Sequence, residues 1–184
     1  TFIGLGVMGY PMAGHLSKEG YNVTVYNRSE EKSKLWVNKH VGNYSHSIKK
    51  AVTGSDVVFS CVGNDSDLRD ITLGNDKAFS AMKDGSFFVD HTTTSSDIAV
   101  ELHEKAKENN LNFLDAPVSG GEVGAIKGEL TVMIGGENSI FNKIKPIIEA
   151  YAKNISLIGG PGKGQEAKMV NQICIAGLVQ ALSE

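Results

Sequence analysis

The start of the chain constrains the fold most, because a short apolar stretch there runs into three glycines at fixed spacing. Thr1–Ile3 predict a buried strand, and Gly4, Gly6 and Gly9 follow in a Gly-x-Gly-x-x-Gly pattern. Between a strand and a helix, these glycines permit a tight turn, approach of the backbone to a pyrophosphate, and close packing of the helix on the sheet. A helix over about Met8 to Glu19 would direct its N-terminal N–H groups at that anion. The residues predicted to bind the cofactor here are Gly4, Leu5, Gly6, Val7, Met8 and Gly9.

Strand-like and helix-like stretches alternate along the whole chain. This alternation predicts an α/β fold of the Rossmann type, in which a doubly wound, mostly parallel sheet is covered on both faces. We expect residues 1–162 to form the dinucleotide-binding domain and residues 163–184 to begin a long interdomain helix. No glycine or asparagine cap follows the terminal helix at about Gly164 to Glu184, so we expect more protein in the natural chain.

Finer expectations concern the bounds of the elements. Residues 119–128 are expected to form a glycine-rich loop, and Pro146 to kink or break the helix around it. Trp36 is expected on the buried side of its helix. The expected strands after the first cover residues 21–26, 41–44, 56–62, 86–90, 111–115, 129–134 and 155–158. The residues expected to cap helices are Ser29, Ser45, Asp65 to Asp67, and Ser95 or Ser96.

Composition and charge exclude several classes of function. The formal net charge of the 184 residues is −3 and the charges are dispersed, so nothing favours nucleic acid or an anionic membrane as a partner. Cys61 and Cys174 are too few and too far apart for a disulfide framework or a zinc site, and we expect reduced, buried thiols and no metal. No apolar run reaches the ~20 residues of a membrane span. With no signal peptide at the start, we expect a cytoplasmic protein, or one of the mitochondrial or plastid matrix if a transit peptide has been removed.

The residues after the second expected strand bear on which dinucleotide binds. Asn27 stands about 20 residues past the glycines, where an NAD site carries an Asp or Glu that accepts from the ribose 2′-OH. Asn27 is neutral and is followed by Arg28, which can pair with a 2′-phosphate. Ser29 and Lys32 lie close behind. These residues favour NADP(H) over NAD(H), although a solvated basic turn that opens a helix explains them without a cofactor.

Two polar segments follow later strands, and ligands of such sheets lie at the carboxyl ends of strands. The hydroxyls of the stretch from Asp90 to Ser96 suit a nicotinamide–substrate crevice, although helix capping also explains its serines. Ser119, Gly120 and Gly121 offer a hydroxyl and unobstructed N–H groups, which suit a carboxylate. An ordinary flexible loop is the alternative. His91 is more typical of a hydrogen-bonded structural histidine than of a catalytic acid.

Lys168 is the most specific candidate for chemistry. Lys168 and Asn171 are three residues apart and share one face of the last helix. A lysine desolvated beside a glycine-lined cleft acquires a lowered pKa, as a general acid or base needs, and Asn171 would orient it or bind the substrate. A surface lysine with a packed stem fits the same spacing equally well. The neighbours that indicate a largely buried helix are Met169, Val170, Ile173 and Cys174.

Three ordered motifs resemble those of the β-hydroxyacid dehydrogenase family, and the resemblance covers essentially the whole chain. The motifs are an extended cofactor signature at Gly4–Ala13, a substrate-binding segment at Asp115–Gly121, and a catalytic segment at Gly159–Asn171. The family includes 3-hydroxyisobutyrate dehydrogenase, tartronate semialdehyde reductase and the glyoxylate/succinic semialdehyde reductases. A more distant relative, 6-phosphogluconate dehydrogenase, is disfavoured by the substrate segment. His15 and Val62–Asn64 depart from the family's usual residues.

The resemblance implies roles for individual residues. Lys168 is implied as the catalytic lysine and Asn171 as its partner in the substrate site. Val62 and Thr93 are implied as contacts to the cofactor, Thr93 alternatively to the substrate. A second, all-helical domain is implied after the long helix, where it would complete the substrate cleft and build a homodimer or homotetramer. The ligands implied for the carboxylate of the substrate are Ser119, Gly120 and Gly121.

The expected activity is reversible hydride transfer between NADP(H) and a small 3-hydroxy acid or semialdehyde acid, with Lys168 as the general acid/base. One alternative is an NAD-dependent 3-hydroxyisobutyrate dehydrogenase. Another is a catalytically inactive, NADP-binding scaffold or chromatin-associated module. The presence of Lys168 together with Asn171, and the lack of a basic tail, argue against the inactive scaffold.

Overall fold

The computed structural model describes residues 1–184, in which strands and helices alternate as predicted. The strands are β1 (Phe2–Ile3), β2 (Thr24–Tyr26), β3 (Asn43–Tyr44), β4 (Val57–Ser60), β5 (Phe87–Asp90), β6 (Asn112–Asp115), β7 (Val118–Ser119), β8 (Leu130–Gly135) and β9 (Ala152–Gly159). The helices are α1 (Gly9–Lys18), α2 (Glu30–Val37), α3 (Ile48–Val52), α4 (Asp65–Thr72), α5 (Ala78–Ala81), α6 (Ser96–Glu108), α7 (Gly121–Lys127), α8 (Asn138–Ile148) and α9 (Lys163–Ser183).

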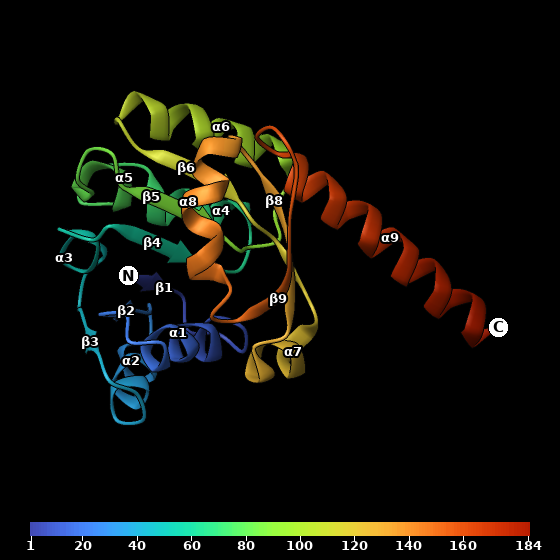
Figure 1. Cartoon of the computed structure of the whole chain (residues 1–184), viewed down its shortest axis with the longest axis horizontal. Helices are drawn as coiled ribbons and strands as arrows, with labels where there is room; N and C mark the ends of the chain where they lie inside the picture. Colours follow the sequence, from blue (N-terminus) through green and yellow to red (C-terminus); the bar gives the residue numbers. More distant parts are fainter.

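The strands form one nine-stranded sheet with helices on both faces (Figure 1). Their order is β3-β2-β1-β4-β5-β6-β8-β7, and β9 pairs with β8. Pairing is parallel from β3 to β6, whereas β8 is antiparallel to β6 and β7 and parallel to β9. The chain changes direction across the sheet between β1 and β4, the kind of switch point at which these sheets bind ligands. The predicted Rossmann-type fold is confirmed.

The parallel register sorts the central side chains onto the two faces of the sheet, because successive residues of a strand point to opposite sides. One buried row, which belongs to the cluster that includes α6, consists of Val58, Phe88 and Phe113. The adjacent row, which belongs to the cluster that includes α1, α2 and α8, consists of Phe59, Val89 and Leu114. Trp36 of α2 is fully buried in the second cluster, as predicted.

Local hydrogen bonds place two helix caps differently from the sequence prediction. Ser47, rather than Ser45, caps α3 by accepting a backbone N–H three residues on. Asn64 does the same for α4, which leaves Asp65 free to make longer-range contacts. Ser29 stands at the N-cap of α2, but its side chain makes no capping bond. Short polar residues cluster at each of these turns, so the pattern locates the turn better than the capping residue.

Two further expectations about local structure are wrong. The predicted loop at residues 119–128 contains α7, which ends at Gly128 with a φ of +69°, a left-handed value suited to glycine. The four glycines of that stretch favour a loop in a sequence-based prediction, although seven of its residues form a helix. The predicted break at Pro146 does not occur, since Pro146 lies in the last turn of α8 and the helix continues to Ile148.

The expectation that α9 is largely buried is also wrong. Figure 1 shows this helix projecting away from the sheet, and only Gly164, Gln165 and Lys168 near its start are buried. Cys174 is exposed, while Cys61 is half-buried and burial raises the pKa of its thiol to about 12. The apolar pattern of α9 is real, but nothing in this chain covers it. Its exposed apolar residues are Met169, Val170, Ile173, Ile175, Leu178, Val179 and Leu182.

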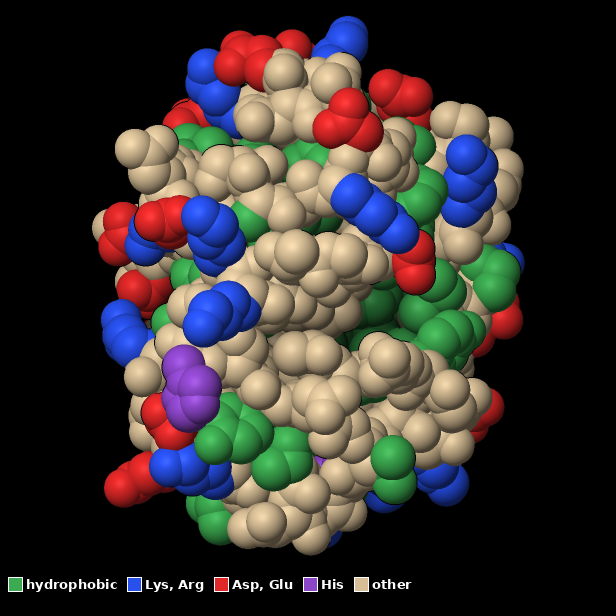
Figure 2. Space-filling view, turned by 90° about the vertical axis from the view of Figure 1, so that its left-hand side faces the viewer, with side chains coloured by type: hydrophobic (Ala, Val, Ile, Leu, Met, Phe, Trp, Pro, Cys, Tyr) green, Lys and Arg blue, Asp and Glu red, His purple; other side chains and the backbone are tan.

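The surface carries mixed charges. Figure 2 shows acidic and basic side chains interspersed over one face without a continuous patch of either sign. The ion pairs are mostly between exposed side chains and therefore contribute little to stability. None of the helices combines the length and apolar character that crossing a lipid bilayer requires.

Candidate active site

The glycine-rich turn after β1 is shaped by the absence of side chains. Gly4 has a φ of +95°, which glycine adopts readily, and a Cβ there would overlap the carbonyl oxygen of Cys61. A Cβ on Gly9 would overlap the carbonyl oxygen of Gly4, so the first turn of α1 packs directly on the turn before it. A Cβ on Gly6 would meet no atom within 4 Å. Gly4 and Gly9 are thus required by the fold, whereas Gly6 borders open space.

Asn27 fixes this turn to the end of β2. Its Oδ1 accepts the Leu5 N–H at 2.8 Å, and its Nδ2 donates to the Ser29 carbonyl oxygen at 3.0 Å. The next side chain, Arg28, is 90% exposed, and its guanidinium lies 3.5 Å from a carboxylate oxygen of Asp67. Asn27 therefore shapes the turn, and Arg28 supplies a charge that faces solvent beside it.

Two cavities adjoin the segment after β4, and Cys61, Val62 and Gly63 line both of them. The Arg28 cavity has a volume of about 580 Å³, and the predicted cofactor residues that line it are Gly4, Gly6, Asn27, Arg28, Ser29 and Val62. The Lys168 cavity has a volume of about 470 Å³, and its lining includes Met8, Val62, Thr93, Ser119, Gly120, Gly121 and Lys168. Among the other predicted cofactor residues, Leu5 and Gly9 are buried and Val7 is 64% exposed.

Two carboxyl groups stand in register at the ends of β5 and β6, namely Asp90 and Asp115. The Oδ1 atom of Asp90 accepts from the Ser60 hydroxyl at 2.7 Å and from the Thr92 hydroxyl at 2.6 Å, while its Oδ2 has no partner. Burial raises the pKa of Asp90 to about 7 and also raises the pKa of Asp115. A proton on Asp90 near neutral pH reduces the repulsion between the two groups.

Asp115 fixes the start of α9. Its Oδ1 accepts the Gly162 N–H at 2.8 Å and its Oδ2 accepts the Gln165 N–H at 3.0 Å, so a carboxylate meets the positive end of the helix. A Cβ on Gly164 would lie 2.5 Å from the Met133 carbonyl oxygen and 2.7 Å from Oδ2 of Asp115. Because glycine permits this contact, α9 begins directly against β6 and β8.

Lys168 follows one turn further along α9 and lines the Lys168 cavity. The residue is only 8% exposed, and desolvation lowers the pKa of its ammonium group. None of the ion pairs of the structure includes Lys168, so no carboxylate offsets this effect. A buried, unpaired amine beside a cavity is suited to proton exchange with a ligand.

Asn171 is not brought into the lining of the Lys168 cavity, whereas Gln172 is. Asn171 is half-buried, and its Nδ2 donates to Oε1 of Gln172 at 3.4 Å. On a helix, positions i and i+4 lie closer in angle than i and i+3. Sequence reasoning missed Gln172 because the i, i+3 pair was considered alone, and the i, i+4 spacing from Lys168 would have indicated it.

His91 is held as a structural residue. Its Nδ1 donates to the Ala116 carbonyl oxygen at 2.7 Å, and its Nε2 lies 2.8 Å from the Tyr151 hydroxyl, which donates to it. Burial lowers the pKa of His91 to about 4, so the ring is neutral at physiological pH. With both nitrogens occupied, His91 supports the strand ends as the sequence interpretation favoured.

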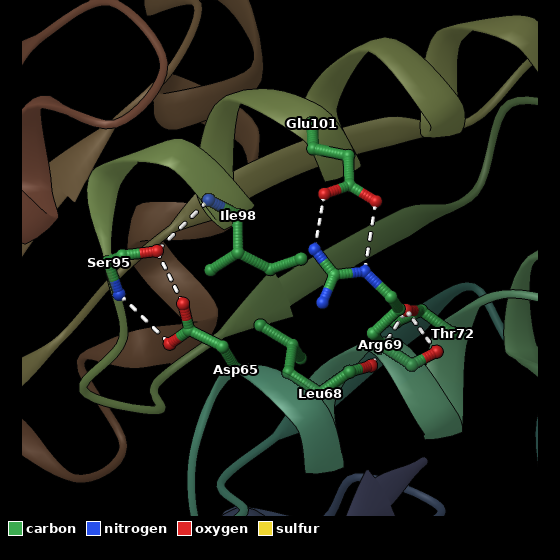
Figure 3. Close-up of polar contacts among 7 residues, drawn as sticks. All are labelled: Asp65, Leu68, Arg69, Thr72, Ser95, Ile98 and Glu101. Atoms are coloured by element: carbon green, nitrogen blue, oxygen red, sulfur yellow. Dashed lines mark hydrogen bonds and ion pairs between the residues drawn. The ribbon is translucent and has the colours of Figure 1, made fainter.

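The loop between β5 and α6, which carries Thr93, is anchored from α4. Asp65 accepts the Ser95 N–H at 3.1 Å and also accepts from the Ser95 hydroxyl (Figure 3). One turn along, Arg69 forms a bidentate pair with Glu101 of α6, at 3.1 and 2.5 Å. Ser95 also caps α6, as predicted. Sequence reasoning did not predict this contact between α4 and α6.

Comparison with known proteins identifies the family of this domain. Residues 1–159 match the family described as the NAD-binding domain of 6-phosphogluconate dehydrogenase. The chain belongs to this family. Its fold is accordingly that of a nicotinamide-dinucleotide-binding domain. Both cavities described above reach the segment after β4, which borders the switch point where such domains bind ligands.

Individual relatives of this NAD-binding domain confirm the resemblance to the hydroxyacid dehydrogenases. An uncharacterized oxidoreductase of Shewanella frigidimarina is 53% identical over 184 residues, which are 100% of this chain and 63% of that protein. The 2-hydroxy-3-oxopropionate reductase of Escherichia coli is 36% identical over 100% of this chain and 62% of its own length. The structure of Mycobacterium tuberculosis 3-hydroxyisobutyrate dehydrogenase with L-serine has a TM-score of 0.90 and 32% identity, and the match covers 95% of this chain and 59% of that one. This chain spans about three fifths of the length of these relatives.

Proposed function

We propose that the complete protein is an NADP(H)-dependent oxidoreductase that transfers a hydride between the nicotinamide and a small 3-hydroxy acid or semialdehyde acid. The observation that carries the proposal is the Lys168 cavity. There a buried, unpaired lysine lines the same space as Thr93 and the Ser119–Gly121 segment. That cavity adjoins the Arg28 cavity through Val62, so a dinucleotide extending through both would bring its reactive ring to the lysine.

Each group of residues is assigned a role according to the turn or cavity to which it belongs. The turn at Gly4–Gly9 and the Arg28 cavity would hold the phosphates and the adenosine part of the cofactor. Val62, Met8 and Thr93, which border the Lys168 cavity, would orient the nicotinamide, whose chemistry is to give or take the hydride. The hydroxyl and backbone of Ser119–Gly121 would bind the carboxylate of the substrate. This arrangement would hold the carbonyl carbon toward the cofactor and the carbonyl oxygen toward Lys168.

Lys168 would exchange the proton of the reaction. In reduction its ammonium group donates a proton to the oxygen that becomes the hydroxyl, and in oxidation the neutral amine accepts that proton. The desolvation that lowers the pKa of Lys168 brings the two protonation states closer in free energy, which helps a group that acts in both directions. Gln172 borders the same cavity and would bind the substrate, a role that the sequence analysis assigned to Asn171.

The natural protein is proposed to continue into an all-helical domain. The exposed apolar residues of α9 need a partner surface, and the relatives are longer than this chain. Such a domain would cover α9, complete the substrate cleft and build a homodimer or homotetramer. Residues 1–162 would then form the cofactor domain, and residues 163–184 the helix that joins the two domains.

Arg28 is expected to decide the preference for NADP(H) over NAD(H). Arg28→Ala should raise the KM for NADPH by about tenfold, because a charged partner of the 2′-phosphate is lost. The KM for NADH should change by less than about twofold, since NADH lacks that phosphate. Measuring both constants at fixed substrate concentration tests the assignment. Lys153→Ala is the control, because its ammonium group pairs with Glu129 away from both cavities. A parent enzyme that prefers NADH would contradict the argument and favour the NAD-dependent 3-hydroxyisobutyrate dehydrogenase.

The substrate class is tested by a panel of short acids. The full-length protein should oxidise NADPH in the presence of at least one of glyoxylate, succinic semialdehyde and tartronate semialdehyde, or reduce NADP⁺ with 3-hydroxyisobutyrate. Absorbance of the reduced nicotinamide follows each reaction directly. NADPH binding without turnover on the whole panel would contradict the proposal and support a catalytically inactive NADP-binding scaffold.

A further inference from the structure

Gln165, near the start of α9, is a buried residue that connects this helix to the β5–α6 loop and to the end of β6. Its side chain is fully buried, and both ends of its amide are used. The Nε2 atom donates to the Thr92 carbonyl oxygen at 2.7 Å, and Oε1 accepts the Thr94 N–H at 3.1 Å. The backbone N–H of Gln165 donates to Oδ2 of Asp115. One residue near the start of α9 therefore binds the β5–α6 loop and the end of β6.

The hydrogen bonds of Gln165 hold the residues on either side of Thr93, the loop residue that faces the Lys168 cavity. Thr92 and Thr94 are buried and held by Gln165, while Thr93 between them is exposed and lines the Lys168 cavity. The Thr92 hydroxyl also accepts the Val62 N–H at 3.0 Å, which extends the same network to the segment shared by both cavities. The anchor shown in Figure 3 holds the other end of this loop from α4. The position of Thr93 is therefore fixed on both sides.

Gln165 also lies three residues before Lys168 on the same helix, within one helical turn. We propose that Gln165 is a positioning residue that sets the distance between Thr93 and Lys168, and so between the nicotinamide and the proton donor. The inference rests on the proposed role of Lys168. Hydride transfer requires donor, acceptor and acid within a few tenths of an ångström of their productive arrangement, and small misplacements of such groups are costly. A residue that binds both the loop and the helix controls that arrangement.

The amide chemistry of this position is specific. A methionine has about the same length but would leave the Thr92 carbonyl oxygen and the Thr94 N–H buried without a partner. A glutamate keeps the acceptor for Thr94 but replaces the donor to Thr92 with a carboxylate oxygen. The other carboxyl groups of this region are Asp90 and Asp115, which would oppose a further negative charge.

Gln165→Met in the full-length enzyme should lower kcat by about 10- to 100-fold, while the Kd for NADPH changes by less than about threefold. The primary kinetic isotope effect with NADPH deuterated at C4 should rise, because hydride transfer becomes slower relative to product release. Thr72→Val is the matched control, since it removes a buried side-chain bond to backbone in α4, away from the cavity. If Gln165→Met lowers kcat no more than Thr72→Val does at equal loss of Tm, the proposal is overturned.

Gln165→Glu gives a second test if the methionine variant does not fold. Protonating the new carboxyl group restores a donor to the Thr92 carbonyl oxygen, so kcat relative to the parent enzyme should recover as pH is lowered. A ratio that does not change with pH would contradict the positioning role. Asp90 and Asp115 also titrate, and the profile of the parent enzyme over the same pH range is the reference against which the recovery is measured.

The double variant Gln165→Met with Lys168→Ala separates this inference from the proposed function. If Gln165 acts through Lys168, the two losses in single-turnover rate should combine to much less than their product. Losses that multiply would show that Gln165 acts independently of Lys168 and would overturn the inference. A Lys168→Ala variant that remains fully active would instead refute the proposed function, whatever Gln165 does.

Discussion

Lys168→Ala is expected to lower kcat for semialdehyde reduction by about 10²- to 10⁴-fold, the range typical for removal of a general acid. The Kd for NADPH should change by less than about threefold, because binding of the dinucleotide is proposed to depend on the glycine-rich turn and Arg28. Steady-state absorbance gives the rate, and quenching or enhancement of nicotinamide fluorescence gives the affinity. Loss of rate with retained affinity is the signature of a group that acts in the chemical step.

Lys163→Ala is the matched control on the same helix. Lys163 is exposed and pairs with Glu166 at 2.8 Å, so its ammonium group stays in water. Its removal should leave kcat within about twofold, as for most surface substitutions. A Lys168→Ala enzyme with a rate near that of Lys163→Ala would mean that Lys168 does not transfer the proton.

The pH profile supplies a second measure of Lys168. Reduction needs the protonated amine, so kcat for reduction should fall as pH rises through the lowered pKa of Lys168. The oxidation direction should show the opposite dependence. His91, with a pKa lowered to about 4, cannot produce this limb, and a limb near pH 7 that persists in Lys168→Ala would belong to Asp90. The part of the pH profile that is lost in Lys168→Ala is the part that reports the titration of Lys168.

Much of the fold was predictable because its determinants are local. The turn at Gly4–Gly9 depends on glycine spacing within one strand–turn–helix unit. The structure has the tight turn and the close helix packing that the spacing predicts, with a φ of +95° at Gly4. The same holds for the order of strands and helices, which follows from periodicity within each segment. The Lys168 cavity was partly predictable, since Thr93 and the segment Ser119–Gly121 come in the chain after β5 and β6, which are parallel neighbours in the sheet.

The remaining features depend on contacts between distant residues. Gln165 binds residues 71 to 73 positions away, and Asp65 binds Ser95 at a separation of 30, so no local pattern indicates either contact. The burial of α9 was overestimated for a related reason. Its apolar residues specify that some surface must cover the helix, but their spacing does not say whether that surface belongs to this segment of chain. Gln172 is the exception, because the local i, i+4 spacing from Lys168 indicates that it borders the cavity in place of Asn171.

The second large effect is expected at Gly9, where Gly9→Ala should lower the free energy of unfolding by about 3 kcal/mol or more. The new methyl group would overlap the Gly4 carbonyl oxygen and lie 2.9 Å from Cε1 of Phe2. Neither neighbour can yield easily, because the carbonyl belongs to a tight turn and the Phe2 ring is fully buried under α1. Urea unfolding followed by circular dichroism measures the loss. Wild-type stability in this variant would show that α1 can move off the sheet.

Gly6→Ala is the matched substitution in the same turn and should separate folding from binding. A Cβ on Gly6 meets no protein atom within 4 Å, and its φ lies outside the left-handed range, so stability should stay within about 0.5 kcal/mol of the parent. The Kd for NADPH should nevertheless rise by tenfold or more, about 1.4 kcal/mol, because a methyl group would occupy the space through which the backbone approaches the pyrophosphate. Equal affinity in both proteins would place the phosphates away from Gly6. If stability and affinity change as expected, Gly9 and Gly6 have different roles although they are three residues apart. Gly9 keeps α1 against the sheet, and Gly6 keeps the turn open to the cofactor.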